Sequence, residues 1–139
     1  MIRNSVIRLL LRIDISVLFL IVSLNCMGAG QTFSVKSIEG YYVNYTVYYG
    51  DTTALVGYLS GNSTSTAVSR SISGKLTIPD EVEYQGKKYK VSDIGDNAFK
   101  GCSLLTEVVL PKCLHRIRSN AFENCTALHT IDLPENLVG

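Results

Sequence analysis

The sequence contains one cysteine–histidine pair and one cysteine–cysteine pair whose side chains are chemically reactive. Cys113 and His115 combine a potential nucleophile with a potential base, and both are also zinc ligands. Neither use is complete, because catalysis also needs an orienting group and an oxyanion site, and zinc needs a cluster of ligands. His129 is equally isolated. We therefore predict no catalytic, cofactor-binding or metal-binding residues and no enzyme activity.

Cys102 and Cys125 occupy matching positions of an internal repeat, so a stacked fold makes them neighbours. An exported chain can oxidise such a pair. Stacked side chains point in parallel, however, and buried cysteine commonly serves as a small hydrophobic residue. We favour two free thiols over a disulfide.

The repeat has a period of 23 residues, since Ile94 recurs as Ile117 and Phe99 recurs as Phe122. A fixed period in the twenties indicates a solenoid, and the L-x-x-V-x-L core of each unit is typical of leucine-rich repeats. A half-repeat precedes the two units at Leu76–Val82. Between them, Glu83–Val91 alternates Tyr, Lys and Val around a glycine, which predicts an inserted hairpin.

The pattern I-G-D-x-A-F-x-x-C-x-x-L-x-x-V-x-L-P-x-x-L resembles the BspA-like leucine-rich repeats of bacterial and protist surface proteins. The A-F-x-x-C segments at 98–102 and 121–125 distinguish this class from other leucine-rich repeats. The resemblance covers residues 74–139 and implies a cell-surface protein with a role in adhesion and host interaction. Because the sequence stops at the end of a period without a polar cap, we expect a short or truncated member.

We predict an α/β-type solenoid, a short leucine-rich repeat array with a parallel β ladder and short helical turns, preceded by an N-terminal β cap. Three parts are predicted: a signal peptide at 1–30, a β cap region at 31–74 and repeats at 75–139. The repeats consist of a half-repeat with a hairpin insertion at 75–93 and two full units at 94–116 and 117–139. The helical turns are expected at Asn97–Phe99 and Asn120–Phe122.

The apolar landmarks of the two units are expected to point inward. They are Ile94, Ala98, Phe99, Cys102, Leu105, Val108 and Leu110 in the first unit, and Ile117, Ala121, Phe122, Cys125, Leu128, Ile131 and Leu133 in the second. Alternate strand residues must then face outward, because successive side chains point to opposite sides of a sheet. These form the predicted partner-binding face, in two columns: Lys75, Glu107 and Thr130, and Thr77, Val109 and Asp132.

The cap region has the alternation of strands. Tyr41–Tyr49 and Thr53–Leu59 predict a hairpin, and Ser60–Ser73 reads as a polar loop. The tyrosines of this region are expected to pack against the sheet with wet hydroxyl groups. An aromatic patch for glycans or partner proteins is the alternative.

The first thirty residues have the layout of a secretory signal peptide. Three arginines precede the apolar run Ile15–Leu24, and the small residues Gly28–Gly30 follow it. A retained anchor is the alternative, and lipidation at Cys26 is a weaker one. We expect a secreted or cell-surface protein.

Composition removes one further class of function. The formal net charge is +1 and the basic residues form no stripe, so binding to nucleic acid has no electrostatic support. We predict a non-enzymatic module that binds an extracellular or host protein through the ladder face, without a cofactor or small-molecule substrate. The alternative is an N-terminal accessory or targeting module of a longer exported protein or enzyme.

Overall fold

The computed structural model describes residues 30–48, 50–58 and 65–138, which form nine strands and no helix. The strands are β1 (Gln31–Lys36), β2 (Tyr42–Val47), β3 (Thr53–Val56), β4 (Ser73–Thr77), β5 (Glu81–Tyr84), β6 (Lys87–Ile94), β7 (Leu104–Val109), β8 (Arg116–Ile117) and β9 (Thr130–Ile131). The predicted signal peptide lies outside the described residues. No helix in the described part is long and apolar enough to cross a membrane.

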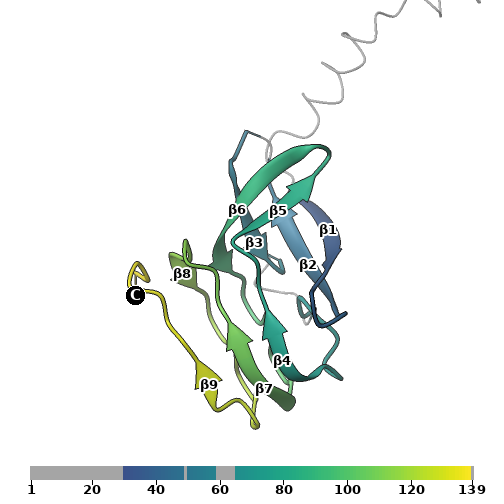
Figure 1. The fold of residues 1–139 in the computed structure, drawn as a ribbon, viewed down its shortest axis with the longest axis vertical. Coiled ribbons are helices and arrows are strands. Elements are labelled where there is room, and N and C mark those ends of the chain that lie inside the picture. The colour runs from purple at the N-terminus through teal and green to yellow at the C-terminus, as the bar shows by residue number, and fades with distance from the viewer. Residues whose placement is uncertain (1–29, 49, 59–64, 139) are drawn as a thin grey trace, which may run out of the picture.

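The repeats coil so that each unit contributes a strand to two parallel ladders (Figure 1). One ladder has the order β4-β7-β9, and its register pairs Leu76 with Val108 and Val108 with Ile131. The other joins β3, β6 and β8, and there Ile94 pairs with Ile117. The predicted parallel ladder of L-x-x-V-x-L segments is therefore confirmed, and a second ladder accompanies it.

The predicted hairpin insertion is also present. β5 and β6 pair antiparallel, with Tyr84 opposite Lys87. The two residues between them, Gln85 and Gly86, have φ values of 51° and 76°. Two consecutive positive φ values are the mark of the type I′ turn, whose twist suits a two-residue hairpin.

Antiparallel strands extend the β3–β6–β8 ladder at its N-terminal side. β2 pairs with β3 as the sequence predicts, and β1, which the sequence analysis did not identify, pairs with β2 along its whole length. The sheet order is β1-β2-β3-β6-β5. Tyr45 of β2 is 1% exposed, and burial raises the pKa of its hydroxyl. Tyr42 is the one exposed tyrosine among the described residues, so the described tyrosines mostly pack within the fold.

The expected polar loop at Ser60–Ser73 is corrected over its described part. Ala67, Val68 and Ile72 are buried, and β4 already begins at Ser73. The Ala67 amide donates to the Ala98 carbonyl at 2.7 Å, so this segment is the turn of an earlier coil stacked on the first unit. This earlier turn does not match the A-F-x-x-C pattern of the repeat, because Val68 stands where the later coils have Phe99 and Phe122.

The expected helical turns are also corrected. The amides of Asn97, Phe99 and Gly101 donate to carbonyls of the next coil, at Ser119, Ala121 and Glu123, over 3.0, 2.8 and 2.8 Å. An α-helix would need those amides for bonds within its own segment. Asn97 and Gly101 also have φ values of 56° and 78°, in the left-handed region that ends a right-handed helix. The turns therefore provide a third line of hydrogen bonds between coils, and the described part of this leucine-rich repeat fold consists of strands and turns without helices.

The two units differ in how deeply their apolar side chains are buried, although equivalent positions carry similar residues. In the first unit all seven predicted core residues are buried except Leu110, which is partly buried. In the second unit Ala121 is buried, and Ile117, Phe122, Cys125, Leu128 and Ile131 are partly buried. Leu133 is 59% exposed, against expectation. It lies beyond the end of β9, and no described strand follows β9 in the ladder to cover it.

Cys102 and Cys125 are free, as favoured above, and neither forms a disulfide in the structure. The Cys125 thiol donates to the Phe99 carbonyl at 3.0 Å. Burial, with a contribution from the neighbouring Cys125, raises the pKa of Cys102 to about 11. The neutral thiol is the form that the core accommodates.

We predict that Phe99→Ala lowers the free energy of unfolding by about 3–5 kcal/mol, because the ring is fully buried and truncation leaves a cavity. Phe122 stacks on Phe99 with ring centroids 5.0 Å apart but is only partly buried. Phe122→Ala, the matched control, is expected to cost less. Urea unfolding followed by circular dichroism measures both, and an equal or larger loss for Phe122→Ala would contradict the burial gradient.

We also predict that Cys113 is alkylated well before Cys102 when the folded protein is treated with iodoacetamide at about pH 8, since only the thiolate reacts. Cys102 is 0% exposed and has a raised pKa, whereas Cys113 is partly exposed. The stabilisation from the protonated Cys102 is complete below its ordinary pKa of 9.0 and is lost as the pH rises toward 11. Peptide mass spectrometry over time reports each site. Denatured protein is the control, and equal rates in the folded protein would refute the prediction.

Candidate binding surfaces

The first predicted column of the ladder face lies in register across β4, β7 and β9. Lys75 is paired with Glu107, and Glu107 with Thr130. Lys75 Nζ and Glu107 Oε1 form an ion pair at 2.8 Å, and this hydrogen bond and the Glu107 charge raise the pKa of Lys75. Both side chains keep solvent exposure, at 49% and 35%. An exposed pair of this kind adds little to stability, so its groups are available to a partner.

The second column is less uniform. Thr77 pairs with Val109, but Asp132 lies past the end of β9. The Thr77 hydroxyl donates to Glu39 Oε1 at 2.6 Å, so Thr77 is half-buried and engaged within the protein. Burial raises the pKa of Glu39, yet hydrogen bonds from Thr77 and Ser37 outweigh it and leave the pKa below its ordinary value. Asp132 and Val109 remain exposed.

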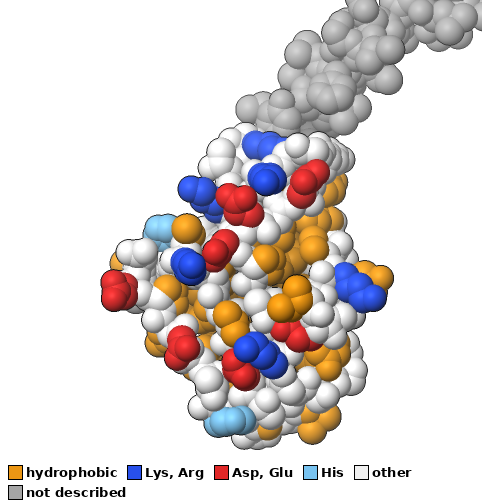
Figure 2. Space-filling view, viewed as in Figure 1, with side chains coloured by type: hydrophobic (Ala, Val, Ile, Leu, Met, Phe, Trp, Pro, Cys, Tyr) orange, Lys and Arg blue, Asp and Glu red, His pale blue; other side chains and the backbone are white. Residues whose placement is uncertain are grey.

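Exposed apolar side chains accompany this face, and the sequence analysis had included only Val109 among them. Leu104, the first residue of β7, is 56% exposed, and Val109 at its end is 36% exposed. Ile38, in the turn between β1 and β2 that also carries Glu39, is 86% exposed. Hydrophobic side chains lie among the charged groups across the view in Figure 2. Leu104 could have been found from the sequence, because Leu105 must point inward and its neighbour must therefore point out.

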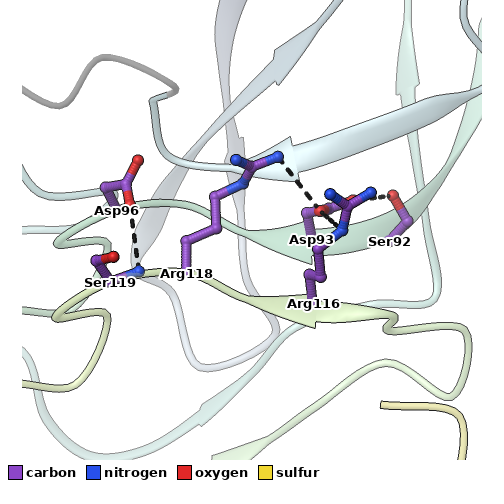
Figure 3. Close-up of polar contacts among 6 residues, drawn as sticks. All are labelled: Ser92, Asp93, Asp96, Arg116, Arg118 and Ser119. Carbon is purple, nitrogen blue, oxygen red and sulfur yellow. Dashed lines mark hydrogen bonds and ion pairs between the residues drawn. The ribbon is translucent and has the colours of Figure 1, made fainter. Parts of the chain in front are cut away.

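The opposite ladder carries a polar cluster that the sequence analysis missed (Figure 3). Asp93 of β6 faces Arg116 and Arg118, which come from the next coil. Its Oδ1 atom lies 3.4 Å from Arg116 Nε and 3.6 Å from Arg118 Nη2, and its Oδ2 accepts a hydrogen bond from the Ser92 hydroxyl at 2.6 Å. Arg118 stands where the first unit has Gly95, so the departure from the repeat pattern was the available signal.

A hollow of about 830 Å³ extends over this cluster. Eight of its ten lining residues are polar or charged, and they come from β3, β6, β8 and the residues beside these strands: Thr53, Ser92, Asp93, Asp96, His115, Arg116, Ile117, Arg118, Ser119 and Val138. A smaller hollow of about 250 Å³ shares several of these residues and adds Tyr48 and Asp51. Burial raises the pKa of Tyr48, while the Arg118 charge opposes the rise and Asp51 adds to it.

The residues first considered for chemistry do not form a centre. Within the described ranges, no group of three or more His, Cys, Asp or Glu side chains is placed to hold a metal ion. His115 and Cys113 sit at the turn before β8, where the His115 amide donates to the Ser92 carbonyl at 2.7 Å. His129 Nδ1 lies 3.0 Å from the Ala127 carbonyl, a local contact within its own turn.

Part of the chain is similar to known proteins. Residues 75–138 match the family described as BspA type Leucine rich repeat region (6 copies). A leucine-rich repeat protein from Bacteroides ovatus is 26% identical, with a TM-score of 0.56 over 76% of this chain and 24% of that protein's length. A leucine rich cell surface protein from Faecalibacterium prausnitzii is 23% identical, with a TM-score of 0.44 over 73% of this chain and 30% of its own. No curated protein matches.

The match covers the two units and their half-repeat, which form the β4–β7–β9 ladder and the β6–β8 part of the other, whereas β3 precedes the matched residues. The A-F-x-x-C turn and the L-x-x-V-x-L strand recur in both units. Residues 75–138 of this chain are thus similar to the BspA type of leucine-rich repeat.

Proposed function

We propose that the chain is a non-enzymatic binding module, exported or held at the cell surface, that engages an extracellular or host protein through the outer face of β4, β7 and β9. The observation that carries the proposal is the regular exposure of this face, where three strands in register present Lys75, Glu107 and Thr130 side by side. Membership of a leucine-rich repeat family supports a role in protein interaction, since solenoids of this kind create extended binding surfaces.

The composition of the face suits a protein partner. Leu104 and Val109 supply exposed apolar area at the two ends of β7, and the Lys75–Glu107 pair lies between them in the ladder. Protein interfaces combine a buried apolar centre with a polar rim that fixes orientation. Desolvation of Leu104 and Val109 would contribute affinity, and the Lys75–Glu107 pair would fix the orientation of the partner.

Export is part of the proposal and rests on the first thirty residues, which follow the signal-peptide layout. Mass spectrometry of protein secreted by cells that express the full chain tests this. An N-terminus near Gln31 is expected, and retention of the leader in a wholly intracellular product would overturn it.

We predict that the double substitution Leu104→Asp and Val109→Asp weakens binding to an extracellular protein by about tenfold or more, because it places charge in the apolar part of the interface. The full chain is immobilised, and biolayer interferometry measures its affinity for purified fibronectin, laminin and collagen. Binding to at least one of the three is expected.

Arg116→Gln, on the opposite ladder, is the matched control and should leave this affinity unchanged. Circular dichroism verifies that each variant is folded. Equal affinity of the Asp variant and the wild type would exclude the β4–β7–β9 face, and failure to bind all three proteins would contradict the extracellular-matrix form of the proposal.

A further inference from the structure

The hollow over β3, β6 and β8 contains two polar atoms whose hydrogen bonds are not satisfied within the protein. Asp93 Oδ1 and Arg118 Nε are both buried, and neither atom has a hydrogen-bond partner in the structure. The ion contacts of Asp93, at 3.4 and 3.6 Å, exceed the usual hydrogen-bond range of about 2.7–3.2 Å. Burying polar groups without such bonds is costly, so Asp93 and Arg118 each keep unused hydrogen-bonding capacity, which a ligand reaches once a covering side chain moves.

The chemistry of a fitting ligand follows from that combination. A hydroxyl group can donate to Asp93 and accept from Arg118 at the same time. A carboxylate has no proton to donate, and an ammonium group cannot accept, so either would satisfy half of the pair. The larger hollow also balances Arg116 and Arg118 against Asp93 and Asp96, so it has no net attraction for ions of one sign.

The surroundings suit a ligand with several hydroxyl groups. Thr53, Ser92 and Ser119 line the same hollow, and its volume of about 830 Å³ lies within the range of about 300–1,000 Å³ found for small-molecule sites. Arg116, whose side chain is 63% exposed, covers Asp93 loosely enough to move aside. Tyr48, in the adjoining hollow, offers an aromatic ring beside the polar groups.

We propose that the hollow over β3, β6 and β8 is a saccharide-binding site in which hydroxyl groups of a sugar insert between Asp93 and Arg118. The site lies on the ladder opposite the protein-binding face and is independent of it. The chain then has two binding faces, one for a protein and one for a glycan.

The test is saturation-transfer difference NMR on the full chain with four disaccharides: maltose, cellobiose, lactose and N,N′-diacetylchitobiose. At least one is expected to bind. Asp93→Asn and Arg118→Gln should each weaken that binding about tenfold or more, since each variant removes a charged hydrogen-bonding partner. Lys75→Gln, which removes a cation from the other ladder, is the matched control and should bind like the wild type.

Thermal melts separate lost binding from lost folding. If Arg118→Gln does not fold, Arg118→Lys keeps the charge but lacks the planar fork, and it should still lower the affinity severalfold. The proposal is overturned if no disaccharide binds, which would leave the pair bridged by water only. It is also overturned if the Asp93 and Arg118 variants bind as the wild type does, or if a glutamate-rich peptide binds more tightly than every sugar.

Discussion

The register between successive coils is the constraint on which this structure depends. Backbone bonds connect the coils at the turns, as from Phe99 to Ala121, and at both ladders, as from Arg118 to Ile94 and from His129 to Thr106. The Phe99 and Phe122 rings stack in the same register within the core. A shift of one residue would turn the apolar residues of a strand outward, so the period of the sequence and the geometry of the backbone must agree.

That agreement explains why much of the fold could be predicted. The 23-residue step and the alternation within L-x-x-V-x-L identify which strands pair and which side chains face inward, and Leu76, Val108 and Ile131 indeed share one line. The hairpin after β5 was visible for a similar reason, since the glycine at position 86 allows the positive φ that the turn requires. Periodic burial and turn chemistry are local properties that a single sequence displays.

The errors have a different physical origin, because each depends on a neighbouring coil. The turn at Asn97–Phe99 has the composition of a helical turn, but the Asn97 and Phe99 amides find acceptors on the following coil. The earlier turn at Ala67 is fixed by bonds to Ala98 and Asn44, and its own sequence carries only a trace of the repeat. The Asp93 cluster also assembles across coils, and nothing within Arg116–Arg118 alone indicates a partner 23 residues earlier.

The two proposed faces differ in how closely they follow the repeat. On β4, β7 and β9 the first column of the proposed partner-binding face, Lys75, Glu107 and Thr130, lies in register with the repeat pattern. On the opposite ladder the second unit departs from the first, and Arg118 replaces the glycine that Val56 and Tyr58 approach closely in the preceding coil. Departures from a repeat are thus informative places to look for function.

The unequal burial of Phe99 and Phe122 has a dynamic consequence. In a linear array each coil is held by its neighbours, so stability is a sum of local contacts and not a single cooperative total. The coil with fewer buried contacts opens first, at a smaller free-energy cost than global unfolding. The coil of Phe122 is therefore expected to open at a smaller free-energy cost than the coil of Phe99, although the two segments have nearly the same residues.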